Sequence, residues 1–130
     1  MNDVSVIYEI LLANTSVNNL VESRIYPYIA KEFEKVPFIV YSKVSVNPAD
    51  SKDGPSKLDT IHAQVSIFQD DYDLVSDLAK KVRTALDRYT GNVNGIEVDS
   101  IRFIDETELP DFDTQYFHIA QEYNIRIKRL

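Results

Sequence analysis

Carboxylates are the side chains of this sequence that could most readily do chemistry. Paired carboxylates at short spacing supply the general acid and base of many hydrolases. The same pattern beside Pro110 is also typical of an exposed, solvated loop. We therefore keep a small hydrolase that uses the Glu106–Asp113 acidic loop as an alternative function, and we predict no catalytic residues. The acidic stretch, which has no basic residue within it, comprises Asp105, Glu106, Glu108, Asp111 and Asp113.

The remaining reactive residue types predict no metal site and no cofactor site. The two histidines, His62 and His118, fall on the polar phases of predicted strands and lack the spacing of a metal-binding pair. There is no cysteine, and the three glycines are too dispersed to build a phosphate-binding loop. The acids between Asp70 and Asp77 lack the alternating spacing and central glycine of a calcium loop, so helix capping and solvation explain them.

Net charge argues against a nucleic-acid-binding protein. The chain has 14 Lys and Arg against 21 Asp and Glu, a net charge of -7. Such an excess repels phosphate backbones instead of releasing their counterions. The longest apolar runs are also far shorter than the roughly 18 to 20 residues that span a bilayer. We expect neither tight binding of DNA nor insertion into a membrane.

Size and composition indicate one globular domain over residues 1–130. Hydrophobic residues make up 44% of the 130-residue chain, enough for one core. The absence of cysteine, and of an N-terminal apolar segment with a cleavage pattern, favours synthesis in a reducing cytoplasm.

The first half of the chain predicts helix followed by strands. Residues 3–13 have helical spacing behind a candidate N-cap at Asp3, and Thr15 or Ser16 is a candidate cap for a further turn. Pro27 favours an extended segment near a sheet edge. Alternation then predicts two paired strands, over 38–46 and 61–67. The side chains expected to face inward are Phe38, Val40, Val44, Val46, Ile61, Ala63, Val65 and Ile67.

The second half predicts one long helix and a strand pair. The helix begins at Asp70 or Asp71, carries an apolar stripe from Leu74 to Tyr89, and has Gly91 as its candidate C-cap. Asn94-Gly95 predicts a tight turn, and a bulge near Asp99 or Ser100 would reconcile the two apolar phases that follow. The last strand ends the sheet, with Phe117, Ile119, Tyr123, Ile125 and Ile127 inward. The fold class is α+β, a mostly antiparallel sheet with helices packed on one face.

Two surface features indicate contact with other chains. A polar, turn-rich loop separates the first two strands, and it is longer than a hairpin needs. Aromatic residues also exceed what one small core requires, and aromatic side chains favour interfaces. The candidate interface loop comprises Asp50, Asp53, Gly54, Pro55, Ser56, Lys57 and Leu58; the surplus aromatics are Tyr8, Tyr26, Tyr28, Tyr41, Phe68, Tyr72, Phe112 and Tyr116.

The succession of these segments resembles the tail-completion or tail-terminator family of long-tailed bacteriophages and prophages, the small head-to-tail joining proteins. The resemblance covers nearly the whole chain in the family's order. The stretches that carry it are SRIYP with VPFIVYSKVS, then DGPSKLDTIHAQVSIF, and finally LAKKVRTALDRYTG with IRFIDETEL and YNIRI.

The resemblance implies a structural subunit without catalytic residues. It implies a ring of six that caps the tail tube, stops its growth and joins it to the head, with the major tail protein and head connector proteins as partners. It further implies a place in the virion after assembly in the host cytoplasm. The interface loop would then reach a neighbouring subunit or the tube, and the acidic stretch could line a lumen through which DNA slides without tight binding. A monomeric adaptor with an exposed sheet edge remains a third possibility.

Overall fold

The computed structural model describes residues 2–29, 35–48, 57–110 and 116–128. Its elements follow one another in this order: a 3-10 helix Asp3–Ser5, α1 Val6–Ala13, α2 Thr15–Val21, β1 Ile25–Pro27, β2 Phe38–Pro48, β3 Leu58–Gln69, α3 Tyr72–Leu86, β4 Gly91–Val93, β5 Ile96–Pro110 and β6 Phe117–Lys128. No helix of this described part is long and apolar enough to cross a membrane.

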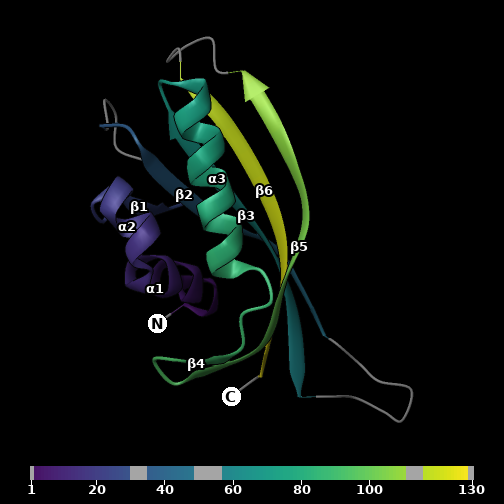
Figure 1. Ribbon diagram of the computed structural model, residues 1–130. Coiled ribbons are helices and arrows are strands. Elements are labelled where there is room, and N and C mark those ends of the chain that lie inside the picture. The colour runs from purple at the N-terminus through teal and green to yellow at the C-terminus, as the bar shows by residue number, and fades with distance from the viewer. Residues whose placement is uncertain (1, 30–34, 49–56, 111–115, 129–130) are drawn as a thin grey trace.

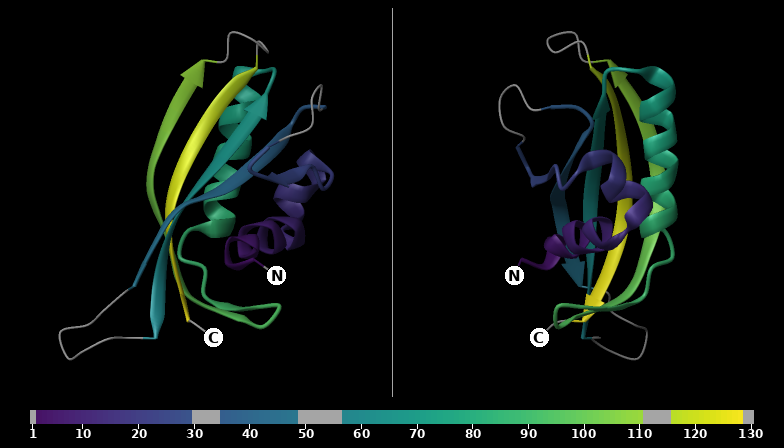
Figure 2. Two further views of the ribbon diagram at one scale, coloured as in Figure 1. Left: turned by 180° about the vertical axis from the view of Figure 1, so that it is seen from behind. Right: turned by 60° about the vertical axis from the view of Figure 1, so that its left-hand side comes forward.

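The strands form one curved sheet in the order β1-β2-β3-β6-β5-β4. Every pairing is antiparallel except the short one between β1 and β2, which is parallel. Figures 1 and 2 show α1, α2 and α3 on the same side of the sheet, so no helix of the described residues covers the other side. We call these the helix face and the open face. The predicted α+β class is confirmed.

β6 lies in the middle of the sheet, although it is the last strand of the chain and was expected to end the sheet. It pairs with β3 along one side and with β5 along the other. Its side chains at Ile119, Tyr123, Ile125 and Ile127 are buried as predicted. Phe117 is the exception, since it is 42% exposed where its ring contacts Tyr72 at the start of α3.

The long helix α3 begins as its sequence predicts. The Asp71 side chain accepts a hydrogen bond from the backbone N–H of Leu74 at 3.0 Å, which caps the first turn. The prediction of its end was wrong. The helix stops at Leu86, with Asp87 as the C-cap, and Gly91 is instead the first residue of β4. The buried stripe is Val75, Leu78, Ala79, Val82 and Leu86, while Leu74 is exposed.

Asparagine side chains cap the 3-10 helix and α2, in place of the predicted caps, and α1 follows Ser5 without a side-chain cap. Asn2 accepts from the N–H of Val4 and Asn14 accepts from the N–H of Val17, each at 3.1 Å. The predicted cap Asp3 also accepts from the Val4 N–H, at 2.7 Å. The amide oxygen of asparagine accepts from the unpaired N–H groups of a first helical turn as well as an aspartate or serine side chain does. Each asparagine comes directly before a predicted cap, Asn2 before Asp3 and Asn14 before Thr15. The helices themselves occupy the predicted segments.

The predicted inward phase of β2 was wrong. The residues on the helix face are Ile39 and Tyr41, both buried, whereas Val44 and Val46 are exposed. Every residue from Phe38 to Tyr41 is apolar, so alternation could not select a phase there. A bulge between Lys43 and Ser45 then shifts the register of the second half of the strand.

The hairpin between β4 and β5 confirms the turn and the bulge. Asn94 has φ 48° and Gly95 has φ 92°, the positive angles that a two-residue turn needs at both central positions. The register of β5 shifts between Val98 and Ser100, at the predicted bulge. It shifts again between Phe103 and Asp105, which the sequence did not indicate.

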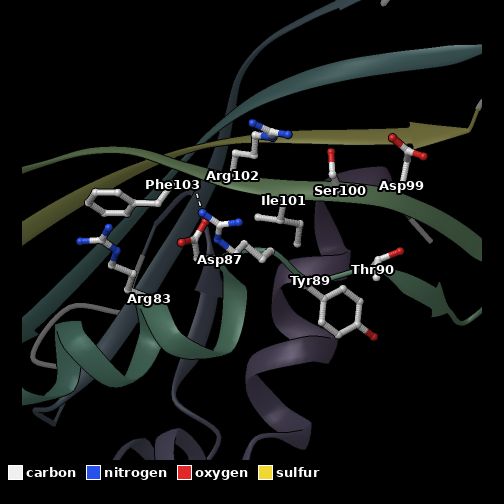
Figure 3. A pocket seen from close by; sticks show the side chains of 10 residues that line it. Arg83, Asp87, Tyr89, Thr90, Asp99, Ser100, Ile101, Arg102 and Phe103 are labelled. Carbon is white, nitrogen blue, oxygen red and sulfur yellow. Dashed lines mark hydrogen bonds between the residues drawn. The ribbon is translucent and has the colours of Figure 1, made fainter.

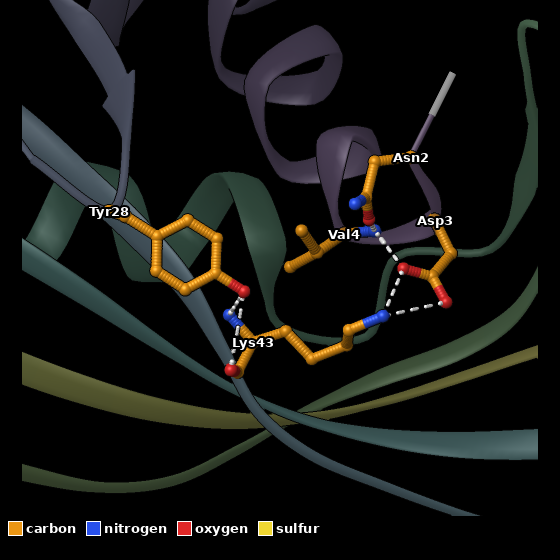
Figure 4. A network of polar contacts seen from close by, with 5 residues as sticks. All are labelled: Asn2, Asp3, Val4, Tyr28 and Lys43. Carbon is orange, nitrogen blue, oxygen red and sulfur yellow. Dashed lines mark hydrogen bonds and ion pairs between the residues drawn. The ribbon is translucent and has the colours of Figure 1, made fainter.

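A small polar network fastens the N-terminal helices to β2. The ammonium of Lys43 contacts the two carboxylate oxygens of Asp3 at 3.1 and 3.4 Å. The hydroxyl of Tyr28 lies 3.4 Å from the backbone nitrogen of Lys43 and 3.5 Å from its carbonyl oxygen. Figure 4 shows Lys43 between these two partners. Tyr28 therefore satisfies strand groups of β2 just past the point where β1 stops.

Candidate assembly surfaces

The predicted interface loop and the acidic stretch lie at opposite ends of the sheet. Of the loop, only Lys57 and Leu58 are described, and Leu58 opens β3 opposite Lys128. Glu108 of the acidic stretch lies opposite Ile119, near the other end of β6. At about 3.3 Å per residue, these two positions along β6 are about 30 Å apart. Asp50, Asp53, Gly54, Pro55, Ser56, Asp111 and Asp113 lie outside the described residues.

The acidic stretch is a strand where it is described, which corrects the expectation of a loop. Asp105, Glu106 and Glu108 all belong to β5. Glu106 accepts a hydrogen bond from the side-chain amide of Gln121 at 2.8 Å, and Glu108 accepts from the hydroxyl of Tyr72 at 2.8 Å. Both carboxylates therefore lie on the helix face. Each is held by a neutral hydrogen-bond donor, and the two are not paired with each other.

Asp105 lies on the open face, directly opposite Glu122 of β6. Like charges that face each other across two strands are destabilising. The Nε2 atom of His62, on β3, lies 3.7 Å from a Glu122 oxygen and offers partial relief when the imidazole is protonated. The fold therefore tolerates a local repulsion at this position of the open face.

A buried polar side chain, Gln121, organises the sheet beneath α3. Its amide nitrogen donates to the carbonyl of Ala79 at 2.8 Å as well as to Glu106, and its oxygen accepts from the hydroxyl of Tyr123 at 2.6 Å. Burial, which disfavours the charged form, raises the pKa of Tyr123 far above its ordinary value, and the carboxylate of Asp87 adds to the rise. Gln121 falls on the apolar phase of β6, which was the available signal for a buried amide.

A row of aromatic rings crosses one end of the open face. Phe38 stacks on Phe68 with ring centroids 4.7 Å apart, and Phe68 stacks on His118 at 4.2 Å. Tyr116 meets Phe38 edge to face at 6.2 Å. Leu109, which is 41% exposed, continues the row on β5 opposite His118. Phe68 and Tyr116 belong to the surplus aromatics expected at an interface, and that expectation stays a prediction.

A hollow of about 460 Å³ opens between the end of α3 and β5. The guanidinium of Arg83 lies 3.8 Å above the ring of Phe103, and the Asp87 carboxylate accepts from the Phe103 N–H at 3.0 Å. Figure 3 shows both side chains beside β5, with Arg102 turned to the other side of the strand. Its lining also includes Asp99, Thr90 and Ser100, and no histidine.

The described residues hold no group of three or more His, Asp or Glu side chains that could bind a metal ion. His118 is engaged in the aromatic row, and His62 lies beside Glu122. These placements favour contact surfaces over a reactive centre.

Comparison with known proteins identifies the family. A sequence model of the family described as "Tail completion protein gp17" matches residues 5–128. The chain belongs to the tail completion protein gp17 family. Its role is therefore structural, in the completion of a phage-type tail.

The fold of this tail-completion protein also occurs in a solved particle. A chain of the structure described as "Virion of native gene transfer agent (GTA) particle" superposes with a TM-score of 0.77 at 14% sequence identity. The match covers 94% of this chain and 91% of that chain, so the two share the whole fold. A search among curated proteins found no match.

Proposed function

We propose that six copies of this tail-completion protein form a ring that closes the end of the tail tube, stops its growth and offers a face to the head connector. The observation that carries the proposal is the family match over residues 5–128. The fold supports it, because the described helices cover only one face of the sheet and the aromatic row lies on the other face. The similar chain of a gene transfer agent virion supports a place in the tail or neck of a particle.

The partners in this proposal are further copies of the chain, the major tail protein and head connector proteins. Assembly takes place in the host cytoplasm, and the protein has no catalytic activity. The geometry gives the hydrolase no support: Glu106 and Glu108 are each bound by a neutral donor, and among the described residues neither has a carboxylate or a histidine as a hydrogen-bond partner.

The two predicted surfaces take separate parts in the proposal. The loop that ends at Lys57 and Leu58 contacts a neighbouring subunit or the tube, since it leaves the sheet at the end away from the aromatic row. The open face turns toward the channel, which places Asp105 and Glu122 where DNA passes. A repulsion between these two carboxylates is understandable if the surface serves to repel phosphate.

Electron microscopy of tube ends tests the ring. Tubes assembled from the cognate major tail protein are mixed with the purified chain and imaged in negative stain. The proposal expects six-fold density at one end of each tube, with none on tubes alone. Monomers scattered along the tube wall, or bare ends at saturating protein, would contradict it. Replacing Gly54 by Trp and Lys57 by Glu should reduce the capped fraction if the loop takes part.

A further inference from the structure

The long strands β2 and β5 each have an outer edge that is only partly paired. β4 pairs with β5 only through Val98, and β1 pairs with β2 only through Tyr41. Beyond those points β5 continues to Pro110 and β2 continues to Pro48. The two free segments, 104–110 and 44–48, are the open edges. Unpaired strand edges are templates for pairing with another chain.

Other groups cover the sheet edge only up to the point where each open edge begins. On β5, the Ile101 carbonyl accepts from the N–H of Arg88 at 2.7 Å, and the Phe103 N–H is bound by Asp87. On β2, the Tyr28 hydroxyl contacts the backbone of Lys43. Within the described part of the chain, no backbone hydrogen bond reaches the outer side of 104–110 or 44–48. Each strand also ends in a proline, which has no N–H to leave unpaired.

The open edges carry apolar side chains that the monomer leaves in water. Val44 is 56% exposed and Val46 is 46% exposed on β2. On β5, Ile104 is 43% exposed and Leu109 is 41% exposed. Exposed β-branched and aliphatic residues on an open edge favour strand addition over solvation.

We infer that the open edge of β5 pairs with the open edge of β2 in the next copy of this chain, so that the sheet continues from subunit to subunit. The inference rests on the proposed ring and names its contact. The long strands alternate in direction along the order β2-β3-β6-β5. Each copy therefore presents β5 running one way and β2 the opposite way on its other side, and the joint is antiparallel like the rest.

Charge favours this joint between β5 and β2 over a joint between two β5 edges. The β5 edge carries Asp105, Glu106 and Glu108, so two such edges together would oppose six carboxylates. The β2 edge has no acid between Val44 and Pro48. A heterologous contact repeats around a closed ring, whereas an isologous one stops at a dimer.

The offset of the two open edges fits a closed ring. Thr107, the centre of the β5 edge, pairs with Ala120 of β6, which in turn pairs with Ser66 of β3. Val46, the centre of the β2 edge, pairs with Ile61 of β3. The two centres are therefore five residues of β3 apart, a shift of about 17 Å along the strands. Across the sheet, the four long strands of one copy span about 19 Å. The strands would then tilt by about 40° from the ring axis, within the 35–45° typical of closed barrels.

Cysteine cross-linking tests the joint, because the chain has no cysteine of its own. Ser45→Cys or Val46→Cys is combined with Thr107→Cys or Glu108→Cys. Adjacent positions point to opposite faces, so each strand offers one position on each face and the four pairs sample both. The control combines Val46→Cys with Asn19→Cys, an exposed position on α2. All variants are first checked for the unfolding midpoint of the parent and then oxidised on tail tubes.

We expect at least one edge pair to give a covalent ladder that extends beyond the dimer, at least tenfold above the α2 control. Amide exchange at 104–109 should also slow at least tenfold on tube ends. Rings on tubes without either signal would overturn the edge pairing while leaving the ring intact. Disulfide-linked dimers of the single variant Val46→Cys, formed in the same amount as the ladder, would also overturn the edge pairing. If tubes remain bare, the ring and its joint fall together.

Discussion

At the scale of single residues, Gln121 is the side chain on which the interior of the sheet most depends. It satisfies a carbonyl of α3, the Tyr123 hydroxyl and the Glu106 carboxylate at once. A buried hydrogen-bonding group that loses its partner costs its full desolvation energy, which is larger than the net gain of the bond. The amide therefore links α3 to both β5 and β6.

Gln121→Leu should lower the free energy of unfolding by roughly 1–3 kcal/mol, because it leaves the Tyr123 hydroxyl without its acceptor inside the protein. Urea denaturation followed by circular dichroism measures the change. Asn124→Leu, at an exposed position of the same strand, is the matched control and should shift stability by no more than about 0.5 kcal/mol. Equal effects of the two substitutions would show that the network contributes nothing.

Tyr123 predicts a loss of stability in alkali. Its folded-state pKa lies above the unfolded value of 10.0, so its contribution is complete below pH 10 and is lost as pH rises beyond it. At neutral pH, Tyr123→Phe should destabilise the protein by about 1 kcal/mol. The difference between the two proteins should shrink near pH 11, since phenylalanine cannot ionise. Urea midpoints at both pH values measure it, and a constant difference would contradict the burial of the hydroxyl.

At the scale of elements, the helices were predictable because their signals are local. Periodic apolar residues and capping side chains act within a few positions, so α3 began at its predicted cap. The strands depend on partners that the sequence does not name. Phe38 to Tyr41 is apolar on both faces, and only the helices above Ile39 and Tyr41 decide which face is the core. For the same reason, sequence could not place β6 at the centre of the sheet.

The candidate surfaces were also predictable only where their signals are local in the sequence. Sequence composition indicated surplus aromatics and an acidic stretch. Tyr28 and Tyr72 reach the surface, but Tyr41 is buried in the core, so that part of the prediction was wrong. The described acids of the stretch are exposed. Sequence composition could not indicate that Glu106 and Glu108 lie on a strand and face α3, because the bulge at Phe103 sets their phase. Nor could it show the open edges, which arise because β1 and β4 are each only three residues long.

The start of α3 gives a test at this scale. Asp71→Ala removes the carboxylate that caps the Leu74 N–H and should cost about 1 kcal/mol. Asp70→Ala changes the neighbouring charge without removing the cap, so it serves as the control. Thermal unfolding compares the two variants. A loss of stability in the Asp70 variant equal to that in the Asp71 variant would mean that charge at the helix start, and not the cap, is responsible.

At the scale of the whole molecule, one covered face, one open face and two unpaired edges describe a subunit better suited to assembly than to catalysis. The net charge of -7 disfavours contact between isolated copies, so the proposed ring would form where the tube supplies a template. Raising the ionic strength should therefore promote self-association, since screening weakens repulsion between like-charged copies.

The central claim is that this chain ends tube growth by occupying the tube end. The direct measurement is the length of tubes growing from the cognate major tail protein, recorded by electron microscopy before and after the chain is added. We predict that elongation stops once about six copies are present per growing end. Tubes that continue to lengthen at an unchanged rate, with the chain present in excess, would contradict the account.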